Sequence, residues 1–452
     1  MNEENLNQVP QLASPSPMQE YKDTYRNDKG KKHNKALVII LAILCPLAVF
    51  GIAVGVFLSS QNNNEPDKPT PVEPEPFVAS DGGTFGLNFL KQAYATDSGN
   101  NMVVSPYSMD VVWRLALAGA NGETKQEILN TIGARSVNNY PQLKTANGLF
   151  IRDTFADYVK PEYIASFEGD LRYDSFSSPD AVNNWVNDNT DGMIEKILED
   201  APSEETVMML LNAIAMDEKW SDKFDCAYTR GEEFTTTDGQ TKTVSMMSGH
   251  ADRYFKTEKA EGVIREYEAY EDGSVFEFVG ILPNGSVKEY LENVNYDEIS
   301  AMNASEIVDR SKEADGSINS VSVLLPRFSF DYTMPNATEV IRSLGINQAL
   351  DKYAADFSNM VDLTGSSYEN FYVGEVLQRA RIEMTETGTK AAAVSAIMGY
   401  GTSAIDSNEY NYYNVEFNRP FVYLIRDKAS QEIIFAGVVE MPEEWSGSTC
   451  SE

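Results

Sequence analysis

The chain has 452 residues, 42% of them hydrophobic and 11% aromatic, which is enough for one large domain or two ordinary ones. Its 69 acidic and 36 basic residues leave a net charge of −33. A surface this acidic repels nucleic acid and anionic lipid headgroups, so the composition argues against DNA or RNA as a partner and indicates a solvated acidic exterior.

The first 79 residues fall into three segments of different composition. Residues 1–35 are polar and predict a disordered tail. Residues 36–58 are 23 consecutive uncharged, mostly aliphatic positions, long enough to span a bilayer. Lysines precede this run and acids follow it, which predicts a cytoplasmic N-terminus and an extracellular domain on a single-pass membrane protein. A cleaved signal peptide is disfavoured because the run is too long and no Ala-x-Ala site follows. Residues 59–79 are rich in Asn, Pro and Glu and predict an extended linker.

The remainder of the chain, residues 80–445, predicts one domain. Helical patterns dominate to about residue 200, beginning with Phe85, Phe89 and Leu90 at helical spacing. Short apolar runs typical of buried strands follow. Because helices come early and strands late with no linker between them, the pattern favours a single α+β domain.

The cysteines and acidic loops do not form a metal site. Cys45, Cys226 and Cys450 lie far apart and have no metal-ligand spacing. So few cysteines predict a domain held by its packed core and not by disulfides. Residues 187–192 superficially resemble a calcium loop, but Leu198 stands where a bidentate Glu is needed. We therefore expect neither a metal nor a cofactor.

Histidines are too scarce for a hydrolase. His33 falls in the predicted tail, which leaves His250 as the one candidate histidine base outside the membrane. It has no obvious orienting partner, and a solvated loop position is the favoured interpretation. A Ser-His-Asp site also needs a nucleophile held at a sharp turn, and no Gly-x-Ser-x-Gly motif is present. The sequence predicts a protein that is not an enzyme.

A conformational hinge is predicted at residues 386–395. Exposed loops favour Gly, Pro, Asn and Asp, yet residues 391–396 contain none of these. One glycine supplies free backbone angles, and the small side chains after it suit a buried strand. On propensity alone, the alanine run favours a short helical turn instead. The candidate hinge residues are Glu386, Gly388, Thr389, Ala391, Ala392 and Ala393.

Strand periodicity assigns each hinge residue to a face. Thr389 and Ala391 would share one face, and Lys390 and Ala392 the other. Because a lysine cannot be buried cheaply, the face of Thr389 and Ala391 is the one predicted to enter a core.

Several ordered segments connect this hinge to a known family. They run from Asn101–Ser108 through Ala116–Thr124, Thr145–Phe150, Asn184–Gly192, Leu211–Phe224, Leu325–Phe328, Leu344–Ile346 and Ala355–Ser358 to Phe417–Phe421. Each one is weak alone, but together and in this order they resemble the serpin family of serine protease inhibitors. The resemblance covers residues 80 to 442.

The resemblance implies a helical N-terminal part, a large central mixed or antiparallel sheet, and an exposed reactive loop at about 388–414. A serine protease would attack this loop, form a covalent acyl complex, and be carried along when the cut loop inserts into the sheet as a new strand. The inhibitor is expected to be a monomer. A network at the sheet centre is implied for Ser105, Ser108, Asn212 and Gln378. Gln378 stands where many members have histidine, and its amide keeps both a donor and an acceptor.

The scissile bond has two possible positions. Counting forward from Gly388 in the family's register places it at Thr402–Ser403, whereas counting back from Phe417 points nearer Glu409, because the loop is long. The forward count is favoured, since insertion length decides where the protease is held. The small and aliphatic residues there predict elastase- or subtilisin-like targets. The alternative function is a non-inhibitory binding or adhesion module at the cell surface.

Overall fold

Residues 81–140, 142–301, 307–310, 317–389 and 409–447 are described by the structure, a computed structural model. They belong to the structural unit Pro74–Glu452. The predicted tail, membrane span and linker lie outside the described residues. Within the described ranges, no helix is both long enough and apolar enough to cross a membrane.

Capping side chains define where the first helices begin. The Asp81 carboxylate accepts a hydrogen bond from the Thr84 amide at 2.5 Å, and the Ser105 hydroxyl accepts one from the Ser108 amide at 3.2 Å, with Pro106 next to the cap. The α-helices are α1 (Gly82–Thr96), α2 (Pro106–Gly119), α3 (Gly122–Ile132), α4 (Pro161–Ser166), α5 (Asp180–Asn189), α6 (Val287–Asn293), α7 (Tyr296–Ala301) and α8 (Ala337–Ser343). Three short 3₁₀ helices are η1 (Asp153–Tyr158), η2 (Cys226–Tyr228) and η3 (Gln348–Leu350).

A seven-stranded antiparallel sheet contains the most deeply buried strands. Its order is β1 (Met102–Val104), β18 (Ile433–Val439), β17 (Phe421–Asp427), β10 (Phe276–Pro283), β9 (Ala260–Glu266), β8 (Arg253–Lys256) and β11 (Ile307–Asp309). Every residue of β10, β17 and β18 is buried, and two of the charges among them, Glu277 of β10 and Arg426 of β17, pair with each other at 2.7 Å.

A four-stranded sheet contains the segment that follows the hinge region in the sequence. Its order is β16 (Tyr410–Glu416), β12 (Ile318–Pro326), β7 (Thr241–His250) and β6 (Arg230–Thr235). β12 pairs in parallel with β16 and antiparallel with β7. The described chain resumes at residue 409, and β16 begins at residue 410.

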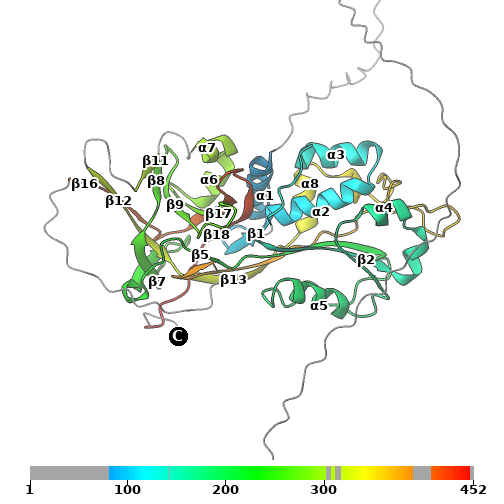
Figure 1. The fold of residues 1–452 in the computed structure, drawn as a ribbon, viewed down its shortest axis with the longest axis horizontal. Helices are drawn as coiled ribbons and strands as arrows, with labels where there is room; N and C mark the ends of the chain where they lie inside the picture. The colour runs from blue at the N-terminus through cyan, green and yellow to red at the C-terminus, as the bar shows by residue number, and fades with distance from the viewer. Residues whose placement is uncertain (1–80, 141, 302–306, 311–316, 390–408, 448–452) are drawn as a thin grey trace, which may run out of the picture. The chain divides into compact units, whose positions relative to one another are not determined.

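Two further sheets form the layer that matters for the site. One has the order β3 (Asp170–Asp174), β2 (Lys144–Arg152) and β4 (Met208–Ala215). The other has the order β13 (Phe328–Thr333), β14 (Arg379–Met384), β15 (Gly388–Thr389) and β5 (Glu218–Lys219). β5 follows β4 after two residues, so one stretch of chain contributes to both sheets. α2 and α3 lie on one side of this layer and α5 on the other (Figure 1).

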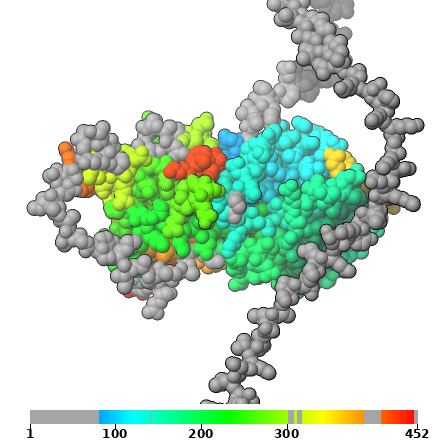
Figure 2. All heavy atoms as spheres, in the orientation of Figure 1, coloured from blue at the N-terminus to red at the C-terminus, as the bar shows by residue number. Residues whose placement is uncertain are grey.

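Chain order is visible in space. On the face seen in Figure 2, the early helices and β2, coloured cyan to blue-green, lie together on one side. The later strands, coloured green to red, lie on the other side. The predicted α+β class is confirmed, although β1, β2 and β3 lie among the early helices and α6, α7 and α8 among the later strands.

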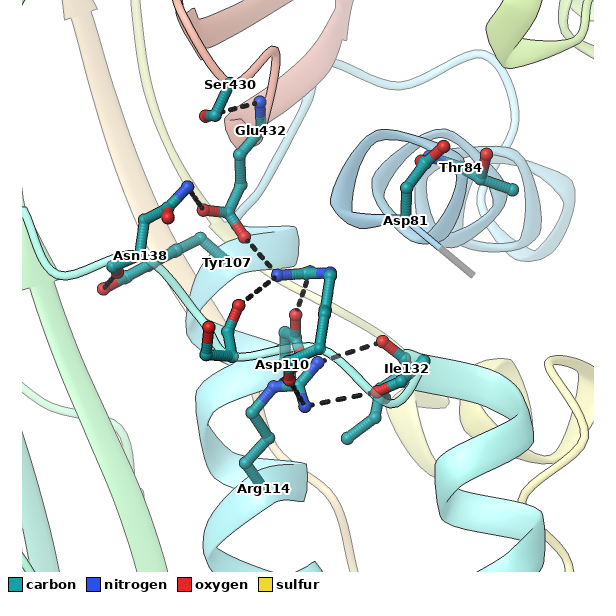
Figure 3. Close-up of polar contacts among 12 residues, drawn as sticks. Asp81, Thr84, Tyr107, Asp110, Arg114, Ile132, Asn138, Ser430 and Glu432 are labelled. Carbon is teal, nitrogen blue, oxygen red and sulfur yellow. Dashed lines mark hydrogen bonds and ion pairs between the residues drawn. The ribbon is translucent and has the colours of Figure 1, made fainter. Parts of the chain in front are cut away.

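A buried polar cluster fixes α2 to the rest of the domain (Figure 3). Asp110 of α2 is 1% exposed and pairs with Arg114 at 2.9 Å and with Arg135. Arg135 also pairs with Glu432, at 2.9 Å, near the start of β18. Burial raises the pKa of Asp110, and the two guanidinium groups oppose this shift. α2 contacts β4 and β18, so this cluster also fixes the position of the helix against these two strands.

Candidate functional site

Side chains of β4 and β14 line the same small cavity, and the position between these two strands is called the slot here. Among the described residues these two strands are not paired, although they lie in one layer. A cavity occupies this position, and Arg381, Ile382 and Glu383 of β14 line it. Its other lining residues are Met193, Ile194, Ile214, Ala215, Met216, Thr389, Ile425 and Phe435. Strand edges facing a gap leave N–H and C=O groups available for pairing, so the slot can accept one more strand.

The start of the predicted hinge already occupies one end of this slot. Gly388 pairs with Lys219, and Thr389 pairs with Glu218 on one side and Met384 on the other. A Cβ added at Gly388 would lie 2.0 Å from the Glu218 carbonyl oxygen, so only glycine fits this approach. The chain therefore enters the gap between β5 and β14 as the two-residue strand β15.

Thr389 sits in a buried aromatic pocket. It is 4% exposed, and its hydroxyl lies 2.6 Å from the Tyr267 hydroxyl. The Tyr267 ring stacks on Trp220 with centroids 4.6 Å apart. Arg265 closes the pocket with its guanidinium 3.8 Å from the centre of the Phe224 ring. Burial lowers the pKa of Arg265 to about 10, so it remains charged at neutral pH.

Glu386 forms a buried ion pair at the turn before β15. The Glu386 side chain is 5% exposed and Arg327, at the start of β13, is 6% exposed. The Arg327 Nε donates to both carboxylate oxygens at 2.9 Å, and the Thr229 hydroxyl donates to one of them. The Phe224 amide donates to the Glu386 carbonyl at 3.0 Å. Both charges are compensated, so the turn is held in a defined place.

Trp220 bonds to the same turn with both of its donors. Its backbone amide donates to the Thr387 carbonyl at 2.9 Å, and its indole Nε1 donates to the Thr385 carbonyl at 3.0 Å. These bonds connect the end of β5 to the chain that leaves β14. They also close the slot at this end.

The four residues predicted for the sheet centre form one chain of contacts, because the Ser108 amide also donates to the Ser105 hydroxyl at 3.2 Å. The Gln378 amide exchanges hydrogen bonds with the backbone of Ser105, at 2.8 and 3.3 Å. The Ser108 hydroxyl donates to the Asn212 carbonyl at 3.4 Å. The Asn212 side-chain Nδ2 donates to the side-chain oxygen Oδ1 of Asn147 at 2.9 Å. Asn212 thus contacts Ser108 through its backbone, and its amide lies with a residue that the prediction did not include.

The boundaries predicted for the reactive loop need correction. Residues 388–389 are part of a sheet and not exposed, and residues 410–414 belong to β16. Both ends form strands because neighbouring strand edges pair with them. Ala391, Ala392 and Ala393 and the predicted scissile residues Thr402 and Ser403 lie outside the described residues.

Two other predictions also change. Cys226 is disulfide-bonded, so the expectation of a domain without disulfides is wrong. Its side chain is half-buried in η2. His250 is exposed as predicted, but it lies at the end of strand β7 and not in a loop. In the part of the chain that the structure describes, no cluster of acidic, histidine and cysteine side chains could hold a metal ion.

Sequence reasoning did not identify the partners of Glu386 and Thr389. Arg327 follows the apolar run of β12, and a charge at the end of a buried run is a signal that a partner is needed. Thr229 and Tyr267 carry no such signal. They come from segments far away in the chain, and only the fold brings them to the hinge.

Glu218, which pairs with Thr389, makes the free energy of unfolding depend on pH. Burial raises the pKa of its carboxyl above the ordinary value of 4.5, although a hydrogen bond with Tyr270 opposes the shift. The folded protein then holds this proton more tightly than the unfolded chain, so the free energy of unfolding falls as pH rises above 4.5 through the raised pKa. We expect Glu218→Gln to be more stable than wild type at pH 7 but not at pH 4. Urea unfolding midpoints at both pH values measure this, and an equal difference at both would contradict it.

The fold and the site define a class of protein, namely an α+β domain with a vacant strand position and a hinge that enters it. Residues 81–442 match the family described as Serpin (serine protease inhibitor), and the chain belongs to the serpin family. Serpins form covalent complexes with serine proteases, and the family is one of protease inhibitors and not of enzymes.

Known proteins across kingdoms are similar to this chain. Serpin B8 of Bos taurus is 29% identical over 388 residues, covering 80% of this chain and 98% of the relative. Serpin-Z10 of Arabidopsis thaliana is 28% identical over 391 residues, covering 79% and 96%. Among solved structures, the native state of the thermophilic serpin tengpin superposes with a TM-score of 0.67 at 25% identity, covering 83% of this chain and 96% of that one. Its latent state superposes with a TM-score of 0.63 at 26% identity, covering 81% and 97%.

Proposed function

We propose that this protein is an irreversible suicide-substrate inhibitor of serine proteases that works by inserting its cut reactive loop as a new strand. The slot between β4 and β14, with Gly388–Thr389 already at its end, is the observation that carries the proposal. A strand that continues from Thr389 into the slot would run antiparallel to both edges, because β15 is antiparallel to both β14 and β5.

The slot explains why insertion would be irreversible. Each inserted residue gains backbone hydrogen bonds worth roughly 1 kcal/mol net, and small side chains bury apolar surface in addition. Ile214 of β4 and Ile382 of β14 line the cavity, so an inserted strand would contact apolar side chains on both sides. The alanines at 391–393 match such a lining, because they carry no polar group that burial would penalise.

The loop sequence supports a preference among proteases. Residues 400–405 are small, aliphatic or aromatic and include neither Arg nor Lys. A protease with a small apolar pocket fits this sequence better than a trypsin-like enzyme with an acidic pocket. We therefore propose elastase- or subtilisin-like targets and a scissile bond at Thr402–Ser403.

A panel of serine proteases tests the function. The protein should form a complex with an elastase- or subtilisin-like enzyme that survives a denaturing gel, whereas a trypsin-like enzyme should form none. Mass spectrometry should place the cut between Gly401 and Ala404. A cut at Glu409 would show that the register counted back from Phe417 is the right one. If no enzyme of the panel forms a complex, the inhibitory function fails and the surface binding module is favoured.

We also propose that the domain is displayed outside the cell on one N-terminal membrane span, residues 36–58. The apolar run and its flanking charges support this, and so does the disulfide of Cys226, because disulfides persist in oxidising compartments. Protease treatment of intact cells should remove the domain from residue 80 onward and spare the N-terminal tail. A domain protected in intact cells, or full-length protein in the medium, would contradict this topology.

A further inference from the structure

Two exposed tyrosines stand at the start of β16, the first described strand after the hinge. Tyr410 is 37% exposed and Tyr412 is 69% exposed, and their rings stack with centroids 5.8 Å apart. We propose that this part of β16 is a docking site for the serine protease that attacks the reactive loop, so that it selects among proteases together with the loop. The proposal rests on the proposed function, because the loop brings the protease to this strand.

β16 turns alternate residues to the inside and to the outside of the domain. On the inner face, Val415 is 1% exposed, and Tyr413 packs against Tyr254 with ring centroids 5.2 Å apart. Tyr410 and Tyr412 therefore lie on the outer face. Among the described residues, they are the only two exposed aromatic rings that stack on each other. A tyrosine ring that is mostly in water gains its full burial energy only when another molecule covers it, and tyrosine is accordingly enriched at the centres of interfaces.

The neighbours of the two rings in the sheet carry no charge. β12 pairs in parallel with β16 and lies beside it at one end of the domain (Figure 1). The residues in register on the outer face of these two strands, called the tyrosine face here, are Tyr410, Tyr412, Asn414, Ile318, Ser320 and Ser322. Acids flank this face at Glu409 and Glu416 but do not enter it. Rigid aromatic rings among small serine and asparagine side chains are typical of surfaces that bind other proteins.

The place of the tyrosine face in the chain identifies its partner. The scissile bond is expected at Thr402–Ser403 or, on the backward count, near Glu409. On either count, a stretch of at most about 25 Å joins the bond to Tyr410. A standard interface of about 800 Å² on each partner is roughly 30 Å across. A protease that holds the scissile bond is therefore close enough to cover the tyrosine face.

A second copy of this chain is the rival partner, because β16 is an edge strand among the described residues. Each copy carries a net charge of −33, so two copies repel each other. A protease that is less acidic meets less repulsion, and a basic one is attracted. The charge of the chain therefore favours the protease as the partner.

Docking acts before the loop is cut. Binding energy at the tyrosine face holds the enzyme at the loop and raises the rate constant for complex formation. The tyrosine face belongs to the sheet of β16, β12, β7 and β6, whereas the hinge enters the sheet that contains β14 and β5. Loss of a tyrosine ring should therefore slow complex formation and leave strand insertion unchanged.

Binding of proteases that cannot cut tests the docking site. The catalytic serine of each protease in the panel is replaced with alanine, and its dissociation constant for the full chain is measured. We expect Tyr412→Ala to weaken the binding of an elastase- or subtilisin-like enzyme at least about tenfold. Tyr412→Phe keeps the ring and should bind within about threefold of wild type.

Tyr353→Ala is the matched control. Tyr353 is 82% exposed and follows η3, which packs against α3, and α3 lies far along the domain from β16 in Figure 1. This variant should bind like wild type. Equal dissociation constants for Tyr412→Ala and Tyr353→Ala, or no binding of any inactive enzyme, would overturn the docking site. A wild-type dimer that Tyr412→Ala dissociates, with protease binding unchanged, would assign the face to a second copy and overturn it too.

Active proteases separate the docking site from the inhibitory function. The rate constant for forming the covalent complex should fall at least about tenfold for Tyr412→Ala, while the number of inhibitor molecules consumed per protease molecule stays at the wild-type value. A rise in that number with an unchanged rate constant would place Tyr412 in the insertion step and overturn the docking role. If no covalent complex forms but Tyr412→Ala still weakens binding of the inactive enzyme, the inhibitory function fails and the docking site stands.

Discussion

Replacing Thr389 with arginine should turn the inhibitor into a substrate. The Thr389 side chain is 4% exposed and packs against Tyr267, so an arginine there must either be buried without a partner or expel the hinge from the sheet. Burying an unpaired guanidinium costs several kcal/mol. Because Thr389 is already buried in the uncut protein, the arginine first expels the hinge from the sheet, and the cost of burying it then falls on insertion. Insertion slows, hydrolysis of the acyl bond overtakes it, and the protease is released.

The control for this change lies one residue along. Lys390→Arg keeps the charge on the face that the strand alternation assigns to solvent, so it should change little. The measurement is the number of inhibitor molecules consumed per protease molecule inactivated, which should rise sharply for Thr389→Arg and stay near the wild-type value for Lys390→Arg. If both variants gave the same number, the alternation would be wrong or inhibition would not use insertion.

Removing Arg327 should destabilise the domain by about 3–5 kcal/mol, since Glu386 would keep a buried charge without its partner. The pair is almost fully enclosed, with Glu386 5% and Arg327 6% exposed. Arg327→Ala should therefore lower the urea unfolding midpoint strongly. It should also release the turn that positions Gly388, so that spontaneous loss of activity accelerates.

Two variants separate the buried charge from other effects. Arg230→Ala breaks the exposed pair with Glu232, whose side chains are 64% and 37% exposed, and should cost at most about 1 kcal/mol. The double variant Arg327→Met with Glu386→Leu should recover part of the lost stability, because it leaves neither charge behind. An Arg327→Ala variant as stable as Arg230→Ala would show that the ion pair does not hold the hinge.

Local pattern in the sequence was sufficient for the fold class and for the face of Thr389. Alternation along a strand depends only on neighbouring residues. Because the charged Lys390 is costly to bury, the opposite face, that of Thr389, was predicted to be buried. The short apolar runs likewise indicated β4, β10, β12 and β18, and in β10 and β18 every residue is buried, so that no polar alternation is needed.

Features that depend on distant segments could not be predicted. Asn212 turns to Asn147 because β2 and β4 place them opposite each other, a register that neither segment reveals alone. The resemblance places the chain up to about residue 414 in the exposed loop, yet pairing with β12 makes residues 410–416 a strand. The disulfide of Cys226 was missed because cysteine spacing in a long chain says little about proximity in space.

Thermal unfolding before and after loop cleavage tests the central claim most directly. If the cut loop fills the slot, a strand of roughly ten or more residues gains about 1 kcal/mol each in hydrogen bonds. At about 2.1 cal/mol/K of unfolding entropy per residue, a domain of this size shifts by roughly 1.3 °C per kcal/mol, so the unfolding midpoint should rise by at least about 10 °C. The cut should be made by a protease that cleaves between Gly401 and Ala404. An unchanged or lower midpoint after a verified cut would contradict insertion, and with it the proposed mechanism.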